Sequence, residues 1–252
     1  MKESISGSPR TPGAAVPSDL ETICVGGITP FTTIDFPGRL AGVFYLQGCP
    51  WRCRYCYNTE FWPFPPEGNL VPNAKVLRFL ESRRKHLEGI VFSGGEPTAH
   101  EKLVNWMRAV KAMGYEIGLH TNGMFPVRLR EVLAVCDWVG MDVKAPFDRY
   151  EKITRVPGSG EAARESAEIL LAEKTPCEFR TTVHPGLLSE DDLLAIAQEL
   201  AARGAQSYVL QTFRREHCQD KELRESDFHT AGISANLRVN LQTLFPHFQI
   251  RE

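Results

Sequence analysis

Long hydrophobic runs are missing from this chain of 252 residues. No stretch has the ~20 consecutive apolar residues of a membrane-spanning helix, and the first residues lack the apolar centre of a secretory signal peptide. An excess of either charge is missing too, because 29 Lys and Arg face 31 Asp and Glu. A nearly balanced chain has no basic surface for nucleic acid. We therefore expect a cytoplasmic protein with neither a membrane nor a nucleic-acid partner.

A disulfide framework is also missing. The sequence has seven cysteines, and an odd number fits a reducing compartment with a metal or cluster site better than a secreted protein held by paired cysteines. Three of the seven cysteines lie close together in the sequence. The remaining four stand alone, form no second ligand group and are expected to be ordinary thiols: Cys24, Cys136, Cys177 and Cys218.

The segment GCPWRCRYCYN, residues 48–58, holds Cys49, Cys53 and Cys56 in the spacing C-x3-C-x2-C. Three thiolates in one short loop suit an iron–sulfur cluster or a zinc ion. A structural zinc site normally has four protein ligands, whereas a four-iron cluster with three thiolates leaves one iron open to hold a substrate. The alternatives are zinc with a distant fourth ligand, and three unconnected thiols.

The length and the 42% hydrophobic composition suit one large α/β domain. Residues 1–19 are rich in Ser, Pro and Gly without apolar periodicity, so we expect a disordered leader before a single domain of residues 20–252. Short apolar pieces between Gly and Pro turns predict a small β-hairpin or irregular strand pair over residues 22–38, with its turn at 35–38. Residues 40–47, LAGVFYLQ, are typical of a strand buried on both faces of a parallel sheet.

The rest of the chain alternates strand and helix patterns. Asn73 and Ser189 are the expected N-caps of two helices, and Gly114 is the expected C-terminal cap of another. Six strands with right-handed crossovers predict a parallel sheet, and the length is short for eight βα units, so we expect a partial (β/α)6 barrel of the TIM type. The five strands after the first are predicted at residues 89–92, 115–120, 138–143, 178–183 and 207–210, and helices at 73–87, 103–113 and 226–244 and after Ser189.

Polar segments follow the ends of these strands, where ligands collect in parallel α/β folds. Residues 93–98 read SGGEPT after the second strand, and the glycines either let backbone approach a ligand or serve a tight turn. Asp142 and Lys144 end the fourth strand, as a ligand-binding pair or as an ordinary ion pair. Arg180 lies within the fifth apolar strand, where a buried charge needs an anionic partner, either a ligand or a protein carboxylate.

The cysteine spacing, followed one strand later by GGEPT, resembles the signature of the radical S-adenosylmethionine (SAM) enzymes. The resemblance implies that Cys49, Cys53 and Cys56 hold a [4Fe-4S] cluster whose open iron takes the amino and carboxylate groups of SAM. TNG at 121–123 and D-x-K at 142–144 resemble segments that, in the glycyl-radical activating branch, contact SAM and help form a cation site near its carboxylate. The cofactor contacts implied in this way are Tyr55, Asn58, Gly94, Gly95, Glu96, Thr121, Asn122, Asp142, Lys144 and Arg180.

Residues 26 to about 215 look like an anaerobic ribonucleoside-triphosphate reductase activating protein, in the subgroup related to pyruvate formate-lyase activating enzymes. The segment GGITPFTTIDFPGRLAGVFYLQGCPWRCRYC carries most of this likeness, and Tyr57 departs from it, because many activating enzymes have His there. Asp35 matches a residue that in the branch contacts the substrate glycine loop, or else it is a turn residue that caps local backbone.

The resemblance implies reductive cleavage of SAM to a 5′-deoxyadenosyl radical, which takes a hydrogen from a glycine of a partner glycyl-radical enzyme, here a class III ribonucleotide reductase. It also implies an electron donor of flavodoxin or ferredoxin type. No catalytic side chain is expected, since cluster and SAM carry the chemistry. Two alternatives stay open: a radical SAM enzyme acting on a small molecule or another peptide, and a non-catalytic iron–sulfur or zinc module.

Overall fold

The computed structural model describes residues 22–64, 70–226 and 233–251, and in this part of the chain one curved sheet of eight strands runs in the order β1 to β8. β1 is antiparallel to β2, and each later strand is parallel to the one before it. The expected leader lies outside the described residues, and the single domain stays a prediction. The strands are β1 (Val25–Thr32), β2 (Ala41–Leu46), β3 (Gly89–Gly94), β4 (Glu116–Thr121), β5 (Trp138–Asp142), β6 (Cys177–Val183), β7 (Ser207–Thr212) and β8 (His247–Arg251).

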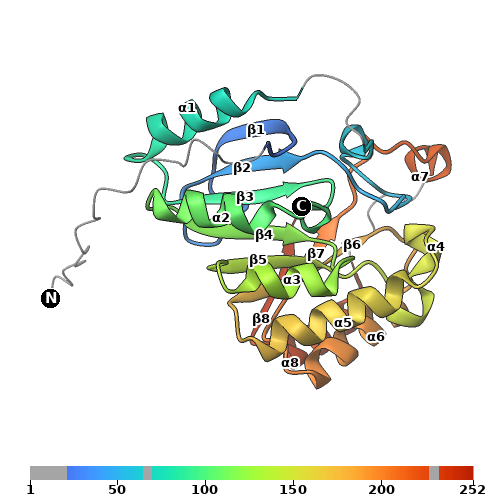
Figure 1. Cartoon of the computed structure of the whole chain (residues 1–252). Helices are drawn as coiled ribbons and strands as arrows, with labels where there is room; N and C mark the ends of the chain where they lie inside the picture. The colour runs from blue at the N-terminus through green and yellow to red at the C-terminus, as the bar shows by residue number, and fades with distance from the viewer. Residues whose placement is uncertain (1–21, 65–69, 227–232, 252) are drawn as a thin grey trace, which may run out of the picture.

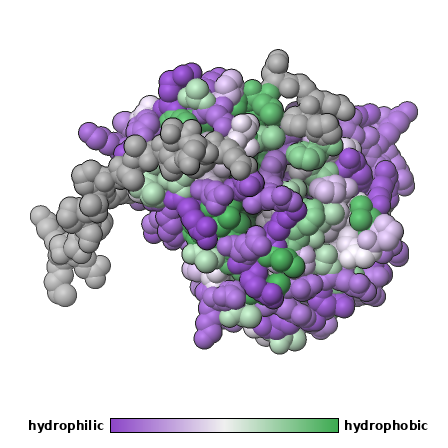
Figure 2. All heavy atoms as spheres, in the orientation of Figure 1, coloured by the Kyte–Doolittle hydropathy of each residue, from purple (hydrophilic) through white to green (hydrophobic). Residues whose placement is uncertain are grey.

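Helices follow most of the strands and cover the outer side of the sheet, with α2, α3 and α5 in front of it in Figure 1. Figure 2 shows that this helical side is mostly hydrophilic, as expected for amphipathic helices that bury their other face. The helices are α1 (Asn73–Arg83), α2 (Leu103–Ala112), α3 (Pro126–Leu133), α4 (Glu151–Thr154), α5 (Ser159–Ala172), α6 (Glu190–Ala202), α7 (Lys221–Glu225) and α8 (Ala235–Leu244), with 3-10 turns at Thr59–Phe61, Pro97–Ala99 and Phe147–Arg149.

Two of the three helix ends predicted from capping residues agree with the structure. Ser189 caps α6 in a capping box with Asp192, and Gly114 after α2 has the left-handed φ of +96° that a C-terminal glycine cap adopts, so both predictions are confirmed. Asn73 is not an N-cap, because the helix begins at Asn73 itself and Pro72 takes the cap position without a side-chain hydrogen bond. A proline before the first turn loses no intrahelical hydrogen bond.

The six predicted parallel strands correspond to β2–β7, which confirms the partial-barrel architecture. The sheet differs from the prediction in having two further strands at its edges, β1 and β8. β1 pairs with β2, so residues 22–38 supply one strand and the turn, and no hairpin of their own. β8 was not predicted and lies beside β7. The predicted helix over 226–244 is α8 alone in its described part, since residues 227–232 lie outside the described residues.

The inner side of the curved sheet has its own small apolar cluster, made of Phe36, Ala41, Val43, Val91 and Trp138. Alternate strand residues point to opposite faces, and the other set packs against the helices in the large core. Phe36, from the connection between β1 and β2, enters the inner side and stacks on Trp138 with ring centroids 5.8 Å apart. This connection therefore closes one end of the interior and leaves the end at the strands' carboxyl termini for the site.

The sheet does not close into a full barrel, because in the described residues β1 and β8 are its two ends and do not pair with each other. None of the described helices is long and apolar enough to cross a membrane.

Candidate active site

A cavity of about 410 Å³ lies at the carboxyl ends of the parallel strands. Its walls combine residues at the ends of successive parallel strands with residues of the loops that follow them. Glu96 is the one predicted site residue that does not line it. The predicted residues that do are Asp35, Cys49, Cys53, Tyr55, Cys56, Asn58, Gly94, Gly95, Thr121, Asn122, Asp142, Lys144 and Arg180, and Gln211 joins them.

The cysteine loop follows β2 directly and is held from outside by α4. The backbone N–H groups of Arg52 and Arg54 donate to the carbonyls of Thr154 and Ile153, each over 3.0 Å. These bonds turn the three thiols toward the cavity, where Cys49 and Cys53 are buried.

The three thiols fit an iron–sulfur cluster. Burial raises the pKa of Cys49 to about 12 and that of Cys53 to about 11, so their thiolates need a cationic centre to offset the cost of burial. In the described ranges no group of three His, Cys, Asp or Glu side chains is arranged to hold a single metal ion. Three thiolates on one cavity suit a four-iron cluster, which they would hold while one iron stays open.

The two glycines of GGEPT are required by neighbouring backbone. Gly94 has a φ of +114°, and a Cβ on Gly95 would lie 2.4 Å from the carbonyl oxygen of Gly48, next to the first cysteine. The Gly95 N–H donates to Leu46 O over 2.8 Å, and the Glu96 N–H donates to Gly48 O over 2.9 Å. The turn thus packs directly on the start of the cysteine loop, and only glycine permits that approach.

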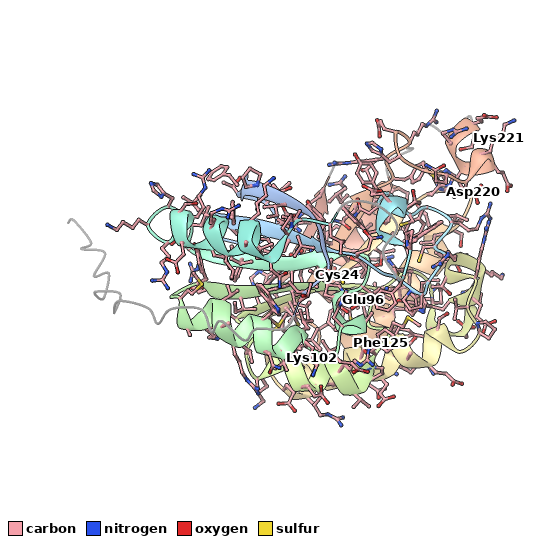
Figure 3. The ribbon with its side chains drawn as sticks, turned by 45° about the horizontal axis from the view of Figure 1, so that its top comes forward. Cys24, Glu96, Lys102, Phe125, Asp220 and Lys221 are labelled. Carbon is pink, nitrogen blue, oxygen red and sulfur yellow. The ribbon has the colours of Figure 1, made fainter. Side chains whose placement is uncertain are left out.

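Glu96, labelled in Figure 3, has no exposed surface and does not line the cavity. Its carboxylate accepts hydrogen bonds from the Thr98 N–H (3.0 Å), the Thr98 hydroxyl (2.6 Å), the Thr121 hydroxyl (2.8 Å) and the Asn122 N–H (2.7 Å). Burial raises the pKa of Glu96 although these four donors oppose the shift. A carboxylate with four protein donors joins the GGEPT turn to the TNG turn, and a contact between Glu96 and the cofactor stays a prediction.

Asp142 at the end of β5, Lys144 just after it and Arg180 on the neighbouring β6 form a charged group in which the two cations are buried and Asp142 is half-buried. Arg180 Nε donates to Asp142 Oδ1 over 2.9 Å, and Lys144 Nζ lies 3.4 Å from Asp142 Oδ2. Burial acts to raise the pKa of Asp142, but the charges of Arg180 and Lys144 outweigh it and hold that pKa below its usual value. The partner of Arg180 is therefore a protein carboxylate. Two cations share one carboxylate, and this leaves positive charge facing the cavity for a ligand carboxylate.

Tyr55 forms part of the same wall. Its buried ring lies under the Lys144 ammonium, with Nζ 5.6 Å from the ring centroid. Asn58 lines the cavity beyond the last cysteine. Their contacts with the adenosine part of SAM, and those of the other wall residues, stay predictions.

Asp35 lies at the inner end of the cavity and is held as a turn residue. Its carboxylate accepts a hydrogen bond from the Thr32 hydroxyl over 2.5 Å, and its backbone carbonyl lies 2.9 Å from His120 Nε2. The carboxylate is thus bonded to a neighbouring side-chain hydroxyl, and the residue also lines the cavity. A contact with a substrate loop stays a prediction.

Several residues that line the cavity were not predicted from the sequence. His120 is the most prominent, because burial first, and then the charge of Arg180, lower its pKa to about 3 and keep the ring neutral. A period of two along the strands could have found three of them, since each lies two positions from a predicted site residue: Ser93, His120 and Thr182. Arg251 belongs to the unpredicted β8 and forms a two-pronged ion pair with Glu178, at 2.6 and 2.8 Å.

Comparisons with known proteins agree with this site. Residues 43–212 match the Radical SAM superfamily. A putative glycyl-radical enzyme activating enzyme of Methanocaldococcus jannaschii is 29% identical over 80% of this chain and 84% of its own length. The pyruvate formate-lyase 1-activating enzyme of Escherichia coli K12 is 31% identical over 64% of this chain and 67% of its own length.

Solved structures support the fold alone. SuiB of Streptococcus suis bound to its precursor peptide SuiA aligns with a TM-score of 0.61 at 12% identity, over 83% of this chain and 48% of that one. QueE of Escherichia coli aligns with a TM-score of 0.52 at 17% identity, over 91% and 93%. The chain belongs to the radical SAM superfamily and is an enzyme of it, related to the glycyl-radical-enzyme activating enzymes.

Proposed function

We propose that this enzyme cleaves SAM reductively and makes a glycyl radical on a partner enzyme, a class III ribonucleotide reductase. The observation that carries the proposal is one cavity lined both by the three cysteines of C-x3-C-x2-C and by polar residues at successive strand ends. The names of the two curated relatives support the activating role. The choice of partner rests on the sequence resemblance in the segment from Gly26 through the cysteine loop.

In this proposal Cys49, Cys53 and Cys56 hold a [4Fe-4S] cluster. Such a cluster, when bound, would supply the electron for the reductive cleavage of SAM, the source of the radical that would take a hydrogen from a glycine. Arg180 and Lys144 offer positive charge to the SAM carboxylate, and Asp142 is the candidate ligand for a hard cation beside it. The buried walls exclude water from the radical.

The remaining partners follow from the same proposal. The glycine-bearing segment enters the cavity that Asp35 lines. A flavodoxin- or ferredoxin-type protein donates the electron. All seven cysteines are free thiols, as the reducing cytoplasm would keep them.

The test is anaerobic reconstitution with iron and sulfide, followed by SAM and dithionite. We expect 5′-deoxyadenosine from the wild type and none from Cys53→Ala, while Cys136→Ala, at a partly buried thiol that does not line the cavity, should keep the activity. Addition of the ribonucleotide reductase should give a glycyl-radical EPR signal on that protein. SAM cleavage without this signal would point to another substrate. A loaded cluster without SAM cleavage would point to an electron-transfer module.

A further inference from the structure

The side-chain amide of Asn122 contacts the first cysteine of the loop. Its Nδ2 lies 3.7 Å from Cys49 Sγ, within hydrogen-bonding range for sulfur, and both residues are buried. Asn122 comes directly after β4, whereas Cys49 follows β2, so the contact joins strand ends that are far apart in the sequence. An N–H group directed at a ligand sulfur acts on whatever that sulfur binds.

The orientation of this amide follows from its other contact. Asn122 Oδ1 accepts the backbone N–H of Met124 over 2.9 Å, and a backbone N–H can only donate. A flipped amide would set two donors against each other and leave the sulfur facing an oxygen. Nδ2 therefore faces Cys49, and both ends of the side chain already have protein partners.

Glu96 holds Asn122 in this place. The Asn122 N–H donates to Glu96 Oε2 over 2.7 Å, and the Glu96 N–H donates to Gly48 O, next to Cys49, over 2.9 Å. The contacts form a closed ring from Gly48 through Glu96 and Asn122 to Cys49. A ring of buried hydrogen bonds fixes the donor before any cofactor binds, so the donor needs no reorganisation when the charge of the cluster changes.

Hydrogen bonds to the sulfurs are one of the factors that set the potential of an iron–sulfur cluster. The reduced cluster carries one more negative charge than the oxidised cluster, so a donor at a ligand sulfur stabilises it more. We propose that Asn122 is a positioning residue that raises the reduction potential of the [4Fe-4S] cluster through its N–H···S contact with Cys49. The inference rests on the proposed function only in requiring that cluster, and it gives Asn122 a role other than contact with SAM.

The test is an anaerobic redox titration of the reconstituted enzyme without SAM or partner, with the reduced cluster read by EPR. Asn122→Ala removes the donor, and Asn122→Asp keeps an acceptor for Met124 but brings an oxygen to the sulfur. We expect the midpoint potential of both variants to lie about 59 mV below that of the wild type. For one electron this shift lowers the ratio of reduced to oxidised cluster about tenfold at a fixed potential. Ser166→Ala is the matched control, because Ser166 donates to Gly123 O in the same turn over 2.7 Å but does not touch a cysteine.

The outcomes separate the inference from the proposed function. Potentials equal to the wild type in both Asn122 variants, at full iron content, overturn the inference and leave the proposed function standing. An equal fall in Ser166→Ala overturns it too, because the turn and not the donor would then be responsible. If Asn122→Ala binds too little cluster to be titrated, Asn122→Ser takes its place. Serine keeps a short hydroxyl donor, so its midpoint potential should lie between the value expected for the alanine variant and that of the wild type. A wild type that binds no cluster overturns both.

Discussion

At the scale of single residues, Gly95 shows how one position can serve two segments. The nearest atoms to a Cβ at this position would be the Gly48 carbonyl oxygen at 2.4 Å and the Phe61 carbonyl oxygen at 2.7 Å, both backbone atoms that cannot rotate away. A ligand is not needed to explain this glycine. Its substitution should therefore damage the cluster site before SAM is involved.

We expect Gly95→Ala to lower the free energy of unfolding by about 3 kcal/mol or more, because overpacking against fixed backbone exceeds the usual 1–3 kcal/mol for side-chain crowding. Reconstituted iron content should fall with it. The measurements are urea unfolding and iron per chain. Gly27→Ala is the control, since its nearest contacts would be side-chain atoms at 3.5 Å or more. Equal iron content in the two variants would contradict this account.

His120 makes stability depend on pH. Its pKa is lowered to about 3 in the folded protein, so between about pH 3 and the ordinary value near 6.5 the unfolded chain binds more protons at this residue. Its contribution is complete above about pH 6.5 and is lost as the pH falls, by about 1.4 kcal/mol for each pH unit. His100 and His184, whose pKa values are also lowered, add to the same limb.

We therefore expect His120→Gln to flatten the loss of stability between pH 7.5 and pH 5, although the variant starts from a lower value. Cluster-free protein should be unfolded with urea at several pH values. The control is His86→Gln, at an exposed position in the turn after α1 that does not line the cavity, which should keep the wild-type slope. A His120→Gln slope equal to that of the wild type would show that burial of this ring does not govern the acid limb.

At the scale of elements, α7 ties the cysteine loop to the C-terminal part of the chain. Asp220, labelled at its start in Figure 3, caps the helix through Leu223 N–H and accepts Arg54 Nε over 2.7 Å and Arg155 Nη2 over 3.3 Å. Arg54 lies between the second and third cysteines. Hydrogen bonding to Arg54 is the first cause that lowers the pKa of Asp220, so the carboxylate is charged at neutral pH.

We expect Asp220→Asn to speed the release of iron to a chelator and to cost about 1–2 kcal/mol of unfolding free energy, because asparagine keeps the cap but loses the charged hydrogen bonds. Glu222→Gln is the matched control. Glu222 contacts the same Arg54 at 2.7 Å, but its side chain is 82% exposed, so its loss should cost less than about 0.5 kcal/mol. Equal iron-release rates in the two variants would show that the contact of Asp220 with Arg54 does not stabilise the cysteine loop.

The same elements show what sequence could predict. The strands β2–β7 were predictable because each is an apolar run followed by turn or helix signals, and the cysteine and glycine motifs then fall at strand ends. β8 could not be found, because HFQIR is short and half polar and becomes a strand only through its pairing with β7. The role of Glu96 could not be found either, since its donors come from two separate strand ends.

At the scale of the whole molecule, the open sheet decides how a large partner reaches the cavity. In the described residues β1 and β8 do not pair, so the sheet is an incomplete barrel. Ile34, in the connection between β1 and β2, lines the cavity and has 73% of its surface exposed, which is unusual for isoleucine beside a ligand cavity.

A polypeptide that reaches the cavity beside Ile34 would cover this side chain. We expect Ile34→Asp to raise the KM for the partner enzyme about fivefold, the equivalent of about 1 kcal/mol of lost apolar contact. The measurement is glycyl radical formed per 5′-deoxyadenosine released, over a range of partner concentrations. Val127→Asp is the control, because Val127 is 66% exposed on α3 and does not line this cavity. If both variants lower the ratio equally, the partner does not enter beside β1, and the substrate path must be sought elsewhere on the molecule.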